Sequence, residues 1–219
     1  MNNDISRKIA HKLLDKGALR FNFKEPFTWT SGIKSPVYCD NRLSLSYVEV
    51  RNLIRDAFVE IINTKYSDVE VIAGVATGAI AQGAWVADKL NKPFIYVREK
   101  PKGHGLNKVI EGHLEKGQKV VIIEDHISTG GSSYNAFLEL RKVEANVLCM
   151  IATTSYNFPE AKKKFEDNNC ELRILSDFTT IVDVALEKGD ISKEQIIELY
   201  KWHNNPKDYN FDKLSLQPI

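Results

Sequence analysis

The sequence Val120-Val-Ile-Ile-Glu-Asp-His-Ile-Ser-Thr-Gly-Gly-Ser132 contains the strongest structural signal in the chain. It starts with four β-branched residues, a pattern typical of a strand buried on both faces in a parallel sheet. Two carboxylates, Glu124 and Asp125, follow this strand, and a turn rich in hydroxyls and glycine comes next. Apolar residues at helical spacing over 132–143 predict a helix after the turn. This order predicts a ligand site at the carboxyl edge of an α/β sheet.

The turn at 128–132 has the composition of a phosphate-binding loop. Gly130 and Gly131 let the backbone adopt unusual dihedral angles and approach a ligand closely. Free N–H groups at the start of a helix attract phosphate. Hydroxyl side chains add further donors, those of Ser128, Thr129 and Ser132. The carboxylates before the turn suit sugar hydroxyls or a metal ion. The string therefore predicts a site for a phosphorylated sugar, and an ordinary strand-to-helix turn is the alternative.

The same string resembles the 5-phosphoribosyl 1-diphosphate (PRPP) motif of the type I phosphoribosyltransferases. The resemblance implies that the acidic pair faces the ribose hydroxyls and that the turn holds the 5′-phosphate. It also implies an α/β fold of this type, with a mainly parallel sheet flanked by helices and an N-terminal hood. The PRPP contacts that it implies form one run: Glu124, Asp125, His126, Ile127, Ser128, Thr129, Gly130, Gly131 and Ser132. We do not interpret His126 as a catalytic residue, because relatives often have an apolar residue there.

Two further segments, Phe27–Arg42 and Val97–Gly105, resemble the orotate phosphoribosyltransferases. These enzymes transfer the phosphoribosyl group of PRPP to orotate and form orotidine 5′-monophosphate and diphosphate in pyrimidine (UMP) biosynthesis. The resemblance covers about residues 9–186. It implies PRPP and orotate as ligands and a homodimer with shared active sites. It also implies Mg²⁺ as the cofactor, held mainly through PRPP and water, because Mg²⁺ rarely uses an all-protein cage.

Cationic side chains are clustered just after the predicted strand at 94–97: Arg98, Lys100, Lys102, His104 and Lys108. Proline and glycine interrupt the cluster, so we expect an exposed loop. Closure of such a loop over departing diphosphate would stabilise its growing charge and exclude water. A solvated basic hairpin is the alternative. The resemblance implies PRPP contacts and catalytic roles for Arg98, Lys102 and His104, with Asp125 as a further catalytic residue. Some relatives have an additional lysine where this chain has Glu99.

The segment at 27–42 is expected to form a turn and a short strand in the hood over the base. The resemblance implies that Tyr38 and Ser128 contact orotate, and a buried core tyrosine is the alternative for Tyr38. Some relatives have a substrate-binding lysine where this chain has Thr30. The small residues at 71–80 resemble a pyrophosphate loop with backbone contacts, because Gly78 occupies a position where certain relatives have lysine. A tight turn without a ligand is the alternative there.

Composition limits the remaining possibilities. The chain has 219 residues, of which 43% are hydrophobic, enough for one core. We expect a single domain over 1–219, with the hood at about 1–45, the core at 46–190 and a C-terminal helix and tail at 191–219. A net charge of +1 indicates neither a nucleic-acid partner nor a membrane surface. The first residues lack the apolar core of a signal peptide, and three widely spaced cysteines indicate reduced thiols in the cytoplasm.

Apolar runs that alternate with amphipathic segments predict the elements of a parallel α/β sheet. Strands are expected at 69–75, 94–97, 120–123, 147–152 and 172–175, and helices at 4–16, 47–62, 78–90, 132–143, 159–166, 178–188 and 192–202. Two rival functions remain. A phosphoribosyltransferase for a purine would share 120–132 but lack the other two segments. A PRPP-sensing transcription regulator would need a basic DNA-binding module, and the N-terminus offers only one short helix.

Overall fold

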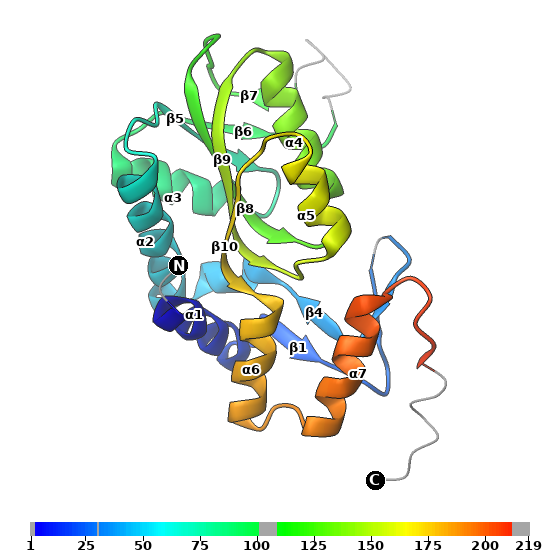
Figure 1. The fold of residues 1–219 in the computed structure, drawn as a ribbon. Helices are drawn as coiled ribbons and strands as arrows, with labels where there is room; N and C mark the ends of the chain where they lie inside the picture. Colours follow the sequence, from blue (N-terminus) through cyan, green and yellow to red (C-terminus); the bar gives the residue numbers. More distant parts are fainter. Residues whose placement is uncertain (1–2, 30, 101–108, 212–219) are drawn as a thin grey trace.

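The structure is a computed structural model that describes residues 3–29, 31–100 and 109–211. A six-stranded sheet crosses its middle in the order β10-β9-β8-β5-β6-β7 (Figure 1). Every neighbouring pair is parallel except β6 and β7, which are antiparallel. This confirms the predicted mainly parallel α/β fold. The strands are β5 (Val71–Val75), β6 (Phe94–Val97), β7 (Ile110–Glu111), β8 (Lys119–Ile127), β9 (Asn146–Ser155) and β10 (Leu172–Asp177).

The β-branched run in β8 alternates between two hydrophobic cores, one on each face of the sheet. Val120 and Ile122 join a cluster with residues of α4 and α5, whereas Val121 and Ile123 join one with residues of α1, α2 and α3. Successive side chains of a strand point to opposite faces, so a continuous apolar run suits a strand covered on both sides. The helices are α1 (Asn3–Asp15), α2 (Val48–Lys65), α3 (Ile80–Leu90), α4 (Gly131–Lys142), α5 (Pro159–Glu166), α6 (Phe178–Lys188) and α7 (Lys193–Asn204).

The hood lies below the carboxyl edge of the sheet in Figure 1. It contains two short antiparallel pairs, β1 (Leu19–Phe21) with β4 (Val37–Cys39) and β2 (Phe27–Thr28) with β3 (Lys34–Ser35), followed by the 3-10 helix η1 (Asn41–Ser46). The helix α1 precedes these pairs, and its Ile9 and Leu13 lie in the same core cluster as Leu19 of β1.

The C-terminal helix α7 packs against the hood. Trp202 is fully buried, and its Nε1 donates a hydrogen bond of 2.9 Å to the backbone oxygen of Lys34. Its ring meets that of Trp29 edge-on, with the ring centroids 5.8 Å apart. Segments from both ends of the described chain are therefore joined beside the sheet, although no local pattern connected them in the sequence.

Most predicted elements agree with the structure, and the helices at 159–166 and 178–188 have the predicted bounds. The predicted end of the central strand, at residue 123, was wrong. β8 continues to Ile127, so Glu124 and Asp125 lie within the strand and do not follow it. The physical reason is pairing with β9, where Glu124 lies opposite Ala152 and His126 opposite Thr154. Among the described residues, no helix is both long and apolar enough to cross a bilayer.

Candidate active site

The acidic pair and the glycine turn lie at the carboxyl end of β8, near the middle of the sheet. β8 lies between β5 and β9, and both neighbours are parallel to it, so three strands end at one edge. The turn at 128–130 leads from β8 into α4, and the turn at 76–79 leads from β5 into α3. Open α/β sheets bind ligands at such an edge. The fold therefore brings the glycine turn, the acidic pair and the segment at 71–80 together.

The glycine turn forms the start of α4. Gly130 is the N-cap residue, with φ 74° and ψ 9°, a left-handed conformation that favours glycine. A Cβ at this position would also lie 3.2 Å from Phe165 and 3.3 Å from Ala161. Because Gly130 has no side chain to cap the helix, the N–H groups of the first turn remain suited to an anion. The turn therefore has the geometry of a phosphate-binding loop.

The two adjacent carboxylates have different surroundings. Glu124 is 4% exposed and faces α4, where its Oε2 accepts a hydrogen bond of 2.7 Å from the Ser133 hydroxyl. Its Oε1 accepts a hydrogen bond of 2.9 Å from the backbone N–H of Asp125. Burial, together with the nearby Asp125 carboxylate, raises the pKa of Glu124 well above its ordinary value. Glu124 is thus held inside the protein by hydrogen bonds, and Asp125 is the more accessible carboxylate.

Asp125 points to the other face of β8, toward the turn between β5 and α3. Its Oδ1 accepts a hydrogen bond of 2.9 Å from the backbone N–H of His126. The carboxylate lies so close to Gly78 that a Cβ at that position would be 2.1 Å from Oδ2. Gly78 therefore leaves the space that the Asp125 side chain occupies. This explains sterically why the turn at 76–79 has glycine where certain relatives have lysine, and it supports backbone contacts for any ligand bound there.

Arg98 marks the base of the cationic loop. Its backbone N–H donates a hydrogen bond of 2.8 Å to the oxygen of Val109, and its guanidinium lies 3.4 Å from the carboxylate of Glu111 in β7. The β6–β7 hairpin therefore brings the two ends of the loop together at one edge of the sheet. Lys102 and His104, the other predicted cations of the site, lie outside the described residues.

Two predicted contacts can be placed more closely. Tyr38 in β4 is half-buried, so it is not a fully buried core tyrosine; its ring centroid lies 5.3 Å from that of Phe27 in the hood. The His126 imidazole turns toward β9, where Nδ1 lies 2.8 Å from the Thr154 hydroxyl, and it meets the ring of Tyr156 edge-on. Burial lowers the pKa of His126 to about 4, so this side chain is neutral at physiological pH.

Comparison with known proteins identifies the family. The model of the phosphoribosyl transferase domain matches residues 46–188. The orotate phosphoribosyltransferase of Porphyromonas gingivalis is 46% identical over 205 residues, covering 94% of this chain and 98% of that protein. The one of Bacillus mycoides is 46% identical over 202 residues, covering 92% and 96%. The chain belongs to the orotate phosphoribosyltransferase family. This agrees with the resemblance of the three sequence segments.

Solved structures support the fold of this family member. The orotate phosphoribosyltransferase of Aeropyrum pernix superposes with a TM-score of 0.73 at 27% identity, covering 84% of this chain and 99% of that one. The UMP synthase of Leishmania donovani superposes with a TM-score of 0.77 at 24% identity, and this chain covers 42% of that longer chain. An adenine phosphoribosyltransferase of Trypanosoma brucei gives 0.61 at 18% identity. The last two similarities show the fold alone.

Sequence reasoning missed several polar residues of this phosphoribosyltransferase site. Ser133 has a local signal, because it directly follows the glycine turn and can reach back to the strand. Asn41 and Thr154 have none. Asn41 Nδ2 donates a hydrogen bond of 2.7 Å to the Thr154 hydroxyl, and these two residues are 113 positions apart. Only the folded chain brings them together.

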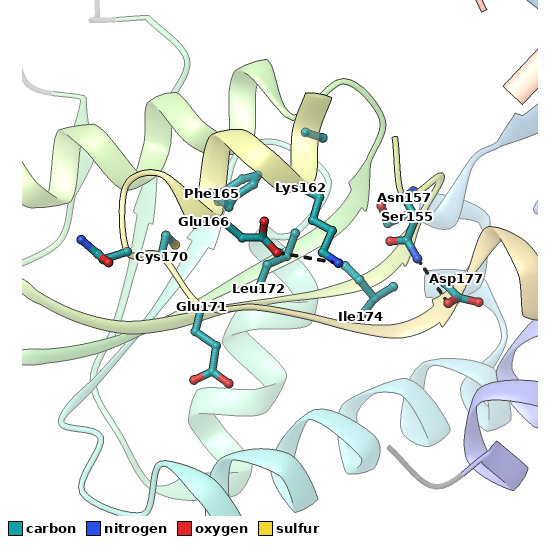
Figure 2. A pocket seen from close by; sticks show the side chains of 12 residues that line it. Ser155, Asn157, Lys162, Phe165, Glu166, Cys170, Glu171, Leu172, Ile174 and Asp177 are labelled. Atoms are coloured by element: carbon teal, nitrogen blue, oxygen red, sulfur yellow. Dashed lines mark hydrogen bonds and ion pairs between the residues drawn. The ribbon is translucent and has the colours of Figure 1, made fainter. Parts of the chain in front are cut away.

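A cavity lies away from the predicted site. It has a volume of about 810 Å³ between α5 and the edge strand β10 (Figure 2). None of the predicted site residues lines it. Its charged groups already have partners: Lys162 pairs with Glu166 at 3.7 Å, and Asn157 donates a hydrogen bond of 3.2 Å to Asp177. We therefore assign the candidate active site to the end of β8 and not to this cavity.

Proposed function

We propose that the protein transfers the 5-phosphoribosyl group from PRPP to orotate, giving orotidine 5′-monophosphate and diphosphate in de novo UMP biosynthesis. The observation that carries the proposal is the meeting of the acidic pair, the glycine turn and the hood at one sheet edge, in a chain 46% identical to an orotate phosphoribosyltransferase. The two segments at 27–42 and 97–105, which resemble the orotate enzymes and not the purine enzymes, support orotate as the base.

Each part of PRPP has a suitable counterpart in the site. The 5′-phosphate binds the N–H groups and hydroxyls of the turn at 128–132. The ribose hydroxyls donate hydrogen bonds to Asp125, and Glu124 supports the same strand from its buried position. The diphosphate meets Arg98 together with Lys102 and His104. Because the phosphate turn and the carboxylate belong to neighbouring segments, the sugar is held in one orientation while the C1–O bond breaks.

The reaction needs positioning and charge stabilisation more than proton transfer. Orotate N1 is acidic, so it reacts as an anion and forms the N1–C1 bond. The C1–O bond breaks, and diphosphate leaves with the electron pair. Cationic groups around the diphosphate stabilise its growing negative charge. The hood holds the base against C1, which replaces a bimolecular encounter with a fixed geometry. Tyr38 and Ser128 are the residues that we assign to the base.

Magnesium fits this site as a partner of the substrate. The described residues include no group of three or more His, Cys, Asp or Glu side chains arranged to hold a metal ion. Asp125 offers an accessible carboxylate beside the turn at 76–79. Mg²⁺ prefers substrate phosphates, water and one or two carboxylates. We therefore propose that Mg²⁺ arrives bound to PRPP oxygens and water, where it neutralises part of the diphosphate charge.

The proposed enzyme is a cytoplasmic homodimer whose cationic loop acts in the site of the neighbouring subunit. Two observations support this arrangement. The described residues that flank the loop, Arg98 and Val109, are joined by a backbone hydrogen bond beside the β6–β7 pair at the edge of the sheet. The three cysteines are free thiols, and two of them are buried, as expected for a reducing compartment. The net charge of +1 gives no support to a nucleic-acid or membrane partner.

The direct test follows orotate absorbance with purified protein. We expect a loss of orotate absorbance that requires both PRPP and Mg²⁺, with adenine, guanine and xanthine as poor substrates. Equal or faster turnover of any of these purines would reject orotate as the base and leave the PRPP site intact. No turnover with any base, combined with specific DNA binding in a gel-shift assay, would favour a PRPP-sensing regulator instead.

A further inference from the structure

One buried amide connects the hood to the strand of the acidic pair. Asn41 is 1% exposed and is the first residue of η1, directly after the hood strand β4. Its Nδ2 donates one hydrogen bond to the backbone oxygen of Asp125 and another, of 2.7 Å, to the Thr154 hydroxyl. Its Oδ1 accepts a weak hydrogen bond of 3.3 Å from the Cys39 thiol. The amide N–H groups of Asn41 therefore donate to the central strands β8 and β9, whereas its amide oxygen accepts from Cys39 in the hood strand β4.

The partners of Asn41 lie between the two halves of the proposed site. On one side, the backbone oxygen that it binds belongs to Asp125, the residue assigned to the ribose hydroxyls. On the other side, Tyr38 precedes Asn41 by only a few residues in the hood. Other hydrogen bonds also tie the hood down, from Trp202 to Lys34 and from the Tyr156 hydroxyl to Val37. Those two come from α7 and from Tyr156, the residue after β9, whose backbone N–H donates a hydrogen bond of 3.1 Å to Ile127 at the end of β8. Of these three links, Asn41 is the one that binds β8 at Asp125 itself.

The surrounding network is suited to a fixed contact. The Thr154 hydroxyl also lies 2.8 Å from Nδ1 of His126 and 3.4 Å from the Cys39 thiol. His126 is neutral at physiological pH and burial raises the pKa of Cys39 to about 12, so the network contains no charge that could draw it toward solvent. Thr154 is fully buried. Within the described residues, the Asn41 amide and the Thr154 hydroxyl both have partners in this network, whereas the buried Nε2 of His126 has none. Satisfied buried hydrogen bonds make a local structure rigid.

We propose that Asn41 is a positioning residue that fixes the base subsite of the hood at a set distance and orientation from the ribose subsite at Asp125. The inference rests on the proposed function, since it requires a base in the hood and a ribose at β8. Asn41 touches neither ligand and acts through the backbone of Asp125 and the hood strand. A ligand that spans both subsites depends on this link. A ligand that occupies only the ribose and phosphate side does not.

The test compares two ligands by isothermal titration calorimetry. Orotidine 5′-monophosphate carries base and ribose phosphate in one molecule, whereas PRPP has no base. We expect Asn41→Ala to weaken binding of orotidine 5′-monophosphate roughly tenfold, the scale for losing one buried hydrogen-bond partner. PRPP affinity should stay within about twofold of wild type. Thr154→Val preserves side-chain shape but removes one partner of the amide, so it should give a smaller loss with the same preference.

Ser44→Ala is the matched control. The Ser44 hydroxyl is buried and donates to the backbone oxygen of Asn41, so this variant loosens the same turn and leaves the amide link to β8 intact. It should not reproduce the preferential loss. Equal weakening of both ligands in Asn41→Ala, no weakening of either, or the same preference in Ser44→Ala would overturn the inference. If wild type binds neither ligand in these titrations and shows no loss of orotate absorbance in the turnover assay, the proposed function fails instead, so the two failures are distinguishable.

Discussion

Replacing Gly78 with alanine should disable PRPP use without unfolding the protein. A Cβ at this position would lie 2.1 Å from Oδ2 of Asp125, and real Cβ contacts essentially never fall below 3.0 Å. The carboxylate must therefore move by at least about 0.9 Å. Its hydrogen bond of 2.9 Å from the backbone N–H of His126 would be stretched or lost. Asp125 would then leave the position from which we propose that it binds the ribose hydroxyls.

The size of the effect follows from the hydrogen bond at stake. A hydrogen bond to a charged group contributes about 1.5–3 kcal/mol, which corresponds to a roughly 10- to 150-fold weaker PRPP affinity. A displacement of about 1 Å in a positioned group can also lower turnover by about 10²-fold. We expect kcat/KM for PRPP to fall at least roughly tenfold, the lower end of the range for the lost hydrogen bond. Isothermal titration of PRPP and initial-rate kinetics measure the two effects separately.

The neighbouring Gly74 provides the contrast. A Cβ there would lie 2.8 Å from the backbone oxygen of Ala79, which cannot rotate away as the end of a side chain can. Gly74→Ala should therefore lower the thermal unfolding temperature, whereas Gly78→Ala should leave it nearly unchanged. Normal PRPP affinity and turnover in a folded Gly78→Ala protein would refute the reasoning, because Asp125 would then not act from the position described.

Further predictions concern the carboxylate, the loop, the buried histidine and the C-terminal helix. Asp125→Asn should cost about 1.5–3 kcal/mol of PRPP binding, and unchanged affinity in calorimetry would give the acidic pair another role. Lys102→Ala should lower kcat strongly with little change in structure. When this variant is mixed with Asp125→Asn and the subunits exchange at random, about a quarter of wild-type activity should return. No recovery after confirmed exchange would mean that the loop acts in its own subunit. The pKa of His126 falls from 6.5 to about 4 in the folded state, so its contribution to the free energy of unfolding is present above pH 6.5 and is lost as the pH falls toward 4. This contribution is about 3 kcal/mol at most. In His126→Leu, the free energy of unfolding measured in urea at several pH values should no longer show it. Trp202→Phe removes the hydrogen bond of 2.9 Å to Lys34 and should raise the KM for orotate several-fold while the KM for PRPP stays constant; equal changes in both would mean that α7 supports the whole fold and not the hood.

The sequence by itself determined most elements of the fold and located the glycine turn that we propose binds phosphate. Strand β8, the glycine turn and helix α4 are consecutive, so hydrophobic periodicity and turn composition within Val120–Ser132 were enough to predict them. Local signals failed at the end of β8. Glu124 and Asp125 are polar, and only the ladder with β9 keeps them in the strand. Pairing with a distant strand overrode the local preference.

The tertiary structure alone decided how the parts of the site face one another. The strand order places β5 and β9 on either side of β8, and this order brings Gly78 against Asp125 and sets Thr154 opposite His126. Periodicity shows which face of an element is apolar but not which distant segment will cover it. The bond between Asn41 and Thr154 spans 113 positions. Such pairs are selected by packing and by the need to satisfy buried polar groups, and those requirements exist only once the chain has folded.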